Sequence, residues 1–140
     1  MAWKPDRPAS KGATAYHDAV SKAEYYIAIL DELMKIAAPK IKNNEIVVDF
    51  GAGTGVSALR LLEFMKANAK LWLVDNSPAW LGKAYDIIPN KNVSCFLLEK
   101  TPDGYAGLSD TVGVGIVDHV ISANTVHLVP CIDEVFAGIS

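Results

Sequence analysis

Short apolar runs alternate along the chain with segments whose apolar residues recur every three or four positions. The runs are 45–50, 70–74, 93–98 and 116–122, and the β-branched residues in them favour strands. The segments with helical spacing are 13–38, 54–67, 77–88 and 131–139. The pattern predicts the order helix, strand, helix, strand, helix, strand, long loop (101–115), strand, helix.

Two of the predicted helices have clear boundary signals. The apolar stripe of the first comprises Tyr16, Val20, Ala23, Ile27, Leu30, Met34 and Ala37. Pro39 ends that helix, while Ser77 and Pro78 suit the N-cap and first position of the third. Residues 1–12 lack periodicity, so we expect a flexible lead-in followed by one domain over 13–140.

Strands that alternate with helices indicate an α/β fold, a doubly wound parallel sheet with right-handed crossovers. The strands are apolar nearly throughout, as expected where both faces of a sheet are covered. Ligands of such sheets bind outside the carboxyl ends of the strands. The residues that follow each strand are therefore the first candidates for a site.

Composition narrows the functional classes. The chain has 140 residues, enough for one domain, with a net charge of -3 and a pI near 5.5. Neither value favours nucleic-acid binding, and no apolar run is long enough to span a bilayer. The first residues lack a signal-peptide pattern, so we expect a cytoplasmic location. Cys95 and Cys131 have no metal-ligand spacing, and we predict no metal site.

Three glycines follow the first strand, and an acid lies at the end of the second strand. Gly51, Gly53 and Gly55 let the backbone turn tightly and approach a ligand, with the amides of the next helix facing it. Asp75 ends the second strand some twenty residues later, where a carboxylate can bind both hydroxyls of a ribose. The alternative is a tight turn beside a surface acid, but the combination favours a cofactor that contains adenosine.

The loop spacing separates two kinds of cofactor. Dinucleotide sites have GxGxxG, whereas this loop is GxGxG with Asp49 two residues before the first glycine. A carboxylate so close would repel a pyrophosphate. It suits the cationic end of S-adenosylmethionine, which also carries an adenosine.

These segments resemble class I S-adenosylmethionine-dependent methyltransferases. VVDFGAGTG resembles the first motif of that family and LWLVDNSPAWLGKA the second. VSCFLLEK, VDHVISANTVHLVP and CIDEVFAGIS resemble, less specifically, its third strand, its fourth strand and the helix that follows. The resemblance covers residues 44–140 and implies a Rossmann-like fold.

The resemblance also implies roles for individual residues. Asp49 would meet the methionyl ammonium group, Asp75 the ribose, and Asn76 the adenine. The other cofactor-binding positions implied are Gly51, Ala52, Gly53, Gly55, Glu99 or Lys100 near the adenine, and Asn124 near the methionine. His127 is a candidate general base for an oxygen or nitrogen acceptor, although a loop histidine without a catalytic role is the alternative.

The chain is shorter than the family pattern that it resembles. Only four strands are recognisable, so we expect a fold truncated after the fourth strand, with the order 3-2-1-4 and the domain incomplete at its C-terminus. The fourth strand would then be an exposed edge, open to a homodimer. We expect methyl transfer to a small-molecule acceptor, with S-adenosylhomocysteine as product. A non-catalytic S-adenosylmethionine-binding or assembly module is the alternative, and an NAD-dependent oxidoreductase is disfavoured by the loop spacing.

Overall fold

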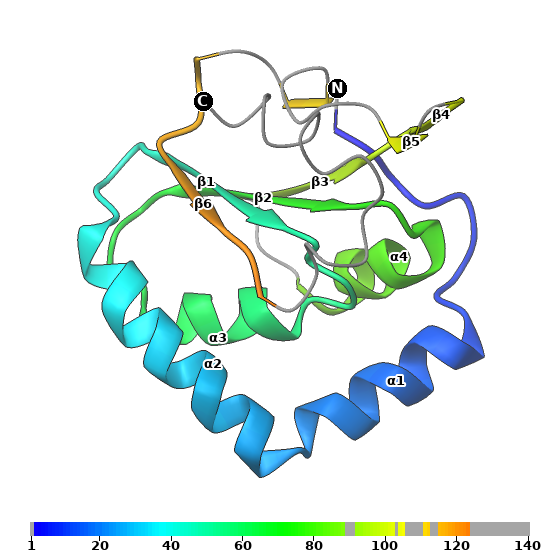
Figure 1. Cartoon of the computed structure of the whole chain (residues 1–140), viewed down its shortest axis with the longest axis horizontal. Coiled ribbons are helices and arrows are strands. Elements are labelled where there is room, and N and C mark those ends of the chain that lie inside the picture. The colour runs from blue at the N-terminus through cyan, green and yellow to red at the C-terminus, as the bar shows by residue number, and fades with distance from the viewer. Residues whose placement is uncertain (1, 89–91, 103, 106–110, 113–114, 124–140) are drawn as a thin grey trace.

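A four-stranded parallel sheet with the order β3-β2-β1-β6 forms the centre of the computed structural model (Figure 1). The structure describes residues 2–88, 92–102, 104–105, 111–112 and 115–123. The strands are β1 (Ile46–Phe50), β2 (Lys70–Asp75), β3 (Val93–Leu97) and β6 (His119–Ile121). This order confirms the predicted parallel sheet and its 3-2-1-4 topology, with β6 as the fourth strand of the prediction.

The four α-helices of the described part lie on one face of the sheet (Figure 1). They are α1 (Lys11–Ser21), α2 (Glu24–Ala37), α3 (Val56–Phe64) and α4 (Pro78–Ile87), and a 3-10 turn at Ala38–Lys40 follows α2. No helix in the part of the chain that the structure describes is long and apolar enough to cross a membrane. The region predicted as a long loop contains a short antiparallel pair, β4 (Lys100–Thr101) and β5 (Gly104–Tyr105).

Side-chain alternation along the strands divides the core into two layers. Val47, Leu71 and Leu73 point to the helix side, where they pack with residues of α2, α3 and α4. Val48 and Val74 belong to a second cluster with Phe50 and Phe96 on the opposite side. The same alternation places Asp49 and Asp75 on the helix side, at the carboxyl ends of β1 and β2.

The predicted helix 13–38 is wrong as one element, because the chain breaks it into α1 and α2. Ala23 has a ψ of 89°, and the Lys22 amide bonds back to the carbonyls of Ala19 and Val20. No proline or glycine marks the break. α1 contacts α4 as well as α3, whereas α2 packs mainly on α3. One straight helix could not make both sets of contacts, so tertiary packing overrides the local periodicity.

Other boundaries differ by a few residues. The helix predicted over 54–67 is the shorter α3, because the chain is already extended at Met65. The fourth strand has only three paired residues instead of all of 116–122. The lead-in is in contact with the domain, since the Trp3 amide donates to the Cys95 carbonyl at 2.6 Å. Its flexibility stays a prediction, and the predicted helix 131–139 lies outside the described residues.

Candidate functional site

A pocket of about 400 Å³ lies at the carboxyl ends of β1 and β2, where the sequence places the site. Its walls come from the glycine loop, the start of α4, and helices α1 and α2. The lining residues are Tyr16, Val20, Tyr26, Gly51, Ala52, Gly53, Thr54, Val56, Ser57, Asp75, Asn76, Ser77, Trp80 and Ala123. Five of the predicted cofactor residues are among them.

The glycine loop is held to the end of β2. The amides of Gly51 and Ala52 both donate to the Val74 carbonyl, at 2.7 and 3.0 Å. The Gly53 amide donates to Asp75 Oδ2 at 2.7 Å, with Gly53 at a φ of +58°. The loop and the acid are thus parts of one structure, and the left-handed backbone that the glycines permit is observed.

Asp75 lies at the pocket wall with both carboxylate oxygens engaged. Oδ1 accepts the Ser77 amide at 2.8 Å, while Oδ2 accepts Gly53. Burial raises the pKa of Asp75. Hydrogen bonds from the backbone amides of Ser77, Gly53 and Asn76 lower that pKa and so oppose the rise. Each oxygen can accept a further hydrogen bond, so the side chain is oriented for a ligand but not saturated by the protein.

Asp49 is a buried acid with a free oxygen. Only 2% of the residue is exposed, and Oδ2 accepts the Ser57 hydroxyl at 2.7 Å. Oδ1 has no hydrogen-bond partner among the described residues. Burial is the largest cause that raises the pKa of Asp49 to about 7, with a smaller contribution from Asp75, while the Ser57 bond lowers it. An unpartnered buried carboxylate oxygen is costly, and a cationic ligand group would relieve that cost.

Gly55 has a packing role. It is the N-cap of α3 at a φ of +95°, and an added Cβ would lie 2.9 Å from the Ile88 side chain and 3.1 Å from Ala84 Cβ. Gly55 does not line the pocket, so this glycine serves the close approach of α3 and α4. Its predicted cofactor contact stays a prediction.

Three aromatic side chains complete the pocket, and the predicted site contains none of them. Tyr16 of α1 stacks on Trp80 of α4, with ring centroids 4.2 Å apart and planes at 21°. Tyr26 of α2 lines the same pocket, and its pKa is raised by burial and by the nearby Tyr16 and Asp49. Trp80 lies one turn into a helix that begins at the predicted sheet edge, a signal that could have identified it.

The remaining predicted residues are less well placed. Asn76 is exposed and lines the pocket, whereas Glu99 is exposed and does not line it. Lys100 lies in β4. Asn124 and His127 lie outside the described residues. Among the residues that the structure describes, no three His, Cys, Asp or Glu side chains gather closely enough to hold a metal ion.

Comparison with solved structures identifies the fold. A protein of Methanococcus maripaludis described as an S-adenosylmethionine-dependent methyltransferase matches with a TM-score of 0.69 and 16% identity. A chain in the complex of the Haloferax volcanii Trm112 methyltransferase activator with its methyltransferase partner matches at 0.63 and 17% identity. This is the class I methyltransferase fold. No family model and no curated protein matches the sequence.

A further methyltransferase agrees and shows how much of the fold is present. Haemonchus contortus phosphoethanolamine N-methyltransferase 2, bound to phosphomonomethylethanolamine and S-adenosylhomocysteine, matches with a TM-score of 0.53 and 17% identity. The match covers 99%, 91% and 87% of this chain for the Methanococcus, Haloferax and Haemonchus structures. It covers 61%, 51% and 32% of those chains, so this chain spans about a third to three fifths of their length.

Proposed function

We propose that this chain is the cofactor-binding portion of a methyltransferase and binds S-adenosylmethionine in the pocket. The observation that carries the proposal is the buried Asp49 Oδ1, which has no partner among the described residues and lies beside the glycine loop. An ammonium group would supply the missing partner and relieve the desolvated charge. A pyrophosphate would be repelled by the same carboxylate, which disfavours the dinucleotide alternative.

Asp49 is buried and does not line the pocket itself, but the residues that do line it fit the same ligand. Asp75 retains acceptor capacity for ribose hydroxyls, and its orientation is fixed by two amides. Asn76 and Gly53 both line the pocket, and we propose that Asn76 flanks the adenine while the Gly53 backbone contacts the cofactor. Glu99 or Lys100, Gly55 and Asn124 complete the proposed set from the resemblance alone.

When bound, the cofactor supplies a methyl group on a sulfonium, which is already a good electrophile. The protein's task is then to orient the acceptor toward that methyl group and to exclude water. His127 is proposed as the base that removes a proton from a small-molecule acceptor. A non-catalytic S-adenosylmethionine-binding or assembly module is the second candidate.

Calorimetric titration with S-adenosylhomocysteine tests the binding proposal. Asp75→Ala should weaken binding by about 1.5–3 kcal/mol, roughly 10- to 150-fold, since it removes hydrogen bonds to a charged group. Glu63→Ala is the matched control, because Glu63 is an exposed carboxylate on α3 outside the pocket. Equal affinities for the two variants would remove Asp75 from the site.

Transfer of label from methyl-labelled S-adenosylmethionine separates the two candidate functions. Label on any member of a small-molecule acceptor mixture supports the enzyme. Binding of the cofactor without transfer to any acceptor supports the module.

We also propose a homodimer through the open edge of β6. No described strand pairs with β6 on the side away from β1. A groove of about 360 Å³ follows that edge, lined in part by Ile36, Lys40 and Asp118. Ile36 shares one face of α2 with Tyr25 and Ile29, and all three are more than half exposed. A two-fold axis would set Lys40 of one copy against the opposite charge of the other's Asp118.

Sedimentation velocity tests this association. Ile36→Glu should shift the protein toward monomer, whereas Tyr85→Glu should not, because Tyr85 is an exposed large side chain on α4 that lies outside the groove. A wild-type protein that is monomeric at all concentrations would contradict the homodimer. One structural neighbour is seen with the Trm112 activator, so a different protein partner is the other occupant to test.

A further inference from the structure

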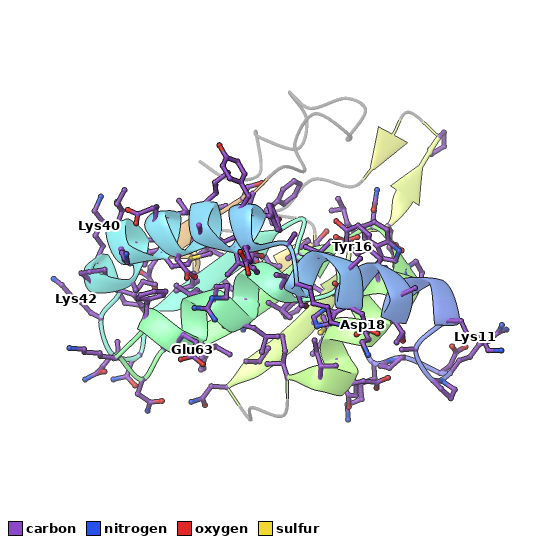
Figure 2. The ribbon with its side chains drawn as sticks, turned by 90° about the horizontal axis from the view of Figure 1, so that it is seen from below. Lys11, Tyr16, Asp18, Lys40, Lys42 and Glu63 are labelled. Atoms are coloured by element: carbon purple, nitrogen blue, oxygen red, sulfur yellow. The ribbon has the colours of Figure 1, made fainter. Side chains whose placement is uncertain are left out.

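Helix α1 covers the pocket although little of it is buried. It contributes Tyr16 and Val20 to the pocket wall, and Ala13 is its one fully buried residue. Figure 2 shows Tyr16 and Asp18 on opposite sides of the helix, and both residues are exposed. A helix with so few buried apolar contacts depends on a small number of specific contacts to hold its position.

Two consecutive residues of α1 make such contacts. The ring of Tyr16 stacks on Trp80 in the first turn of α4. Nδ1 of His17 lies 3.0 Å from Oγ1 of Thr54 in the glycine loop. Trp80 and Thr54 both line the pocket, so the contacts of α1 bridge two of its walls. From the sequence, His17 is interpreted as a solvated helix residue, with a position that faces the ligand as the alternative.

The connection between α1 and α2 can act as a hinge. Lys22 and Ala23 separate the two helices, both are exposed, and Ala23 leaves the helical region with a ψ of 89°. α2 itself is fastened to α3, since Arg60 binds Asp31 through two contacts of 2.6 and 3.1 Å. Movement at the hinge would therefore carry the C-terminal part of α1 away from the pocket and leave α2 in place, while the segment before α1 stays bound to β3 and α4 through Trp3 and Ala9.

We propose that Tyr16 is a positioning residue that holds α1 closed over the pocket, with His17 as a second tie. The closed helix contributes part of the ligand's surroundings, so any ligand that contacts it stabilises the closed state, and loss of the tie weakens that ligand. An aromatic pair of this kind shifts the closed-to-open ratio about 2- to 12-fold. The predicted effect on ligand affinity rests on the proposed function. The contacts of Tyr16 and His17 that hold α1 in place do not depend on it.

Limited trypsin digestion of the ligand-free protein measures opening directly. Lys22 is at the hinge, and cleavage after it requires α1 to leave its position, whereas cleavage after exposed Lys66, just beyond α3, reports the body of the domain. Tyr16→Ala should raise the ratio of Lys22 to Lys66 cleavage about 2- to 12-fold. Tyr85→Ala is the matched control, because Tyr85 is 42% exposed, close to the 41% of Tyr16, and lies on α4 outside the pocket. It should leave the ratio unchanged.

Two results would overturn the proposal. Equal ratios for Tyr16→Ala, Tyr85→Ala and the wild type would show that the stack does not hold α1. Faster cleavage at both sites by the same factor would show general destabilisation and no hinge.

A second arm adds saturating S-adenosylhomocysteine. In the wild type it should slow cleavage after Lys22, and the protection should be smaller in Tyr16→Ala. Calorimetry on the same samples separates the two proposals. Absence of binding in the wild type contradicts the proposed function alone. The cleavage ratios of the ligand-free proteins still show whether Tyr16 holds α1 in place. Binding that leaves Lys22 cleavage unchanged contradicts the closure of α1 over the ligand.

Discussion

Replacing Asp49 with asparagine should remove a specific pH dependence of stability. Burial raises the pKa of Asp49 from 3.8 to about 7, so the folded protein holds this proton more tightly than the unfolded chain. Folding stability contributed by the protonated acid is therefore complete below pH 4 and is lost as the pH rises through 7. Asparagine has nearly the same shape and keeps an oxygen for the Ser57 hydroxyl, but it does not titrate.

The magnitude follows from the shift. About three pK units correspond to about 4 kcal/mol over the whole range, of which about 2–3 kcal/mol falls between pH 5 and pH 8. The protonated acid and the amide of Asp49→Asn each leave one buried polar atom without a partner, so the stabilities of the two proteins at pH 5 should differ by less than about 1–3 kcal/mol, the cost of such an atom. The variant should therefore gain about 2–3 kcal/mol of stability relative to the wild type between pH 5 and pH 8.

Urea unfolding at pH 5, 6, 7 and 8, with both proteins in the same buffers, gives the difference directly. The difference between the two proteins isolates Asp49, because the other acids titrate in both. If the free energy of unfolding changes with pH by the same amount in wild type and Asp49→Asn, Asp49 does not have a raised pKa. The argument that a buried Asp49 carboxylate needs a cationic ligand group would then be wrong.

Other substitutions test the remaining parts of the site. Gly55→Ala should lower the free energy of unfolding by about 2–4 kcal/mol, because it adds a Cβ at a φ of +95° against Ile88, whereas Gly12→Ala, in open space on α1, should be neutral or stabilising by up to about 1 kcal/mol in the same urea experiment. Gly53→Val should abolish S-adenosylhomocysteine binding in calorimetry, and retained affinity would show that the backbone there does not meet the ligand. Affinity should also rise from pH 6 to pH 8 as Asp49 ionises to meet the ammonium group, and a flat profile would separate Asp49 from the ligand.

Local patterns were sufficient to predict the sheet and its acids. The strand runs, the glycine loop and the positions of Asp49 and Asp75 at strand ends follow from spacing alone, because parallel strands bring their carboxyl ends to one edge. The hydrogen bond between the Gly53 amide and Asp75 was not predictable, since it depends on the register of β1 and β2 and on the loop conformation.

Features that depend on packing between elements distant in the sequence could not be predicted from local patterns. The break between α1 and α2 has no glycine or proline, so periodicity alone joins the two helices. The stacking of Tyr16 on Trp80 depends on where α1 crosses α4. Gly55 carries the same motif signal as Gly53, yet it faces α4 instead of the pocket, and a glycine motif cannot distinguish the two uses.

Backbone amide NMR spectra recorded during titration with S-adenosylhomocysteine test the central claim most directly. The account predicts saturable shifts at Gly51 and Gly53, which line the pocket, and an unchanged signal at Gly115, which has open surroundings and lies outside it. Unchanged signals at Gly51 and Gly53 at saturating ligand, or a shift confined to Gly115, would contradict cofactor binding at the glycine loop.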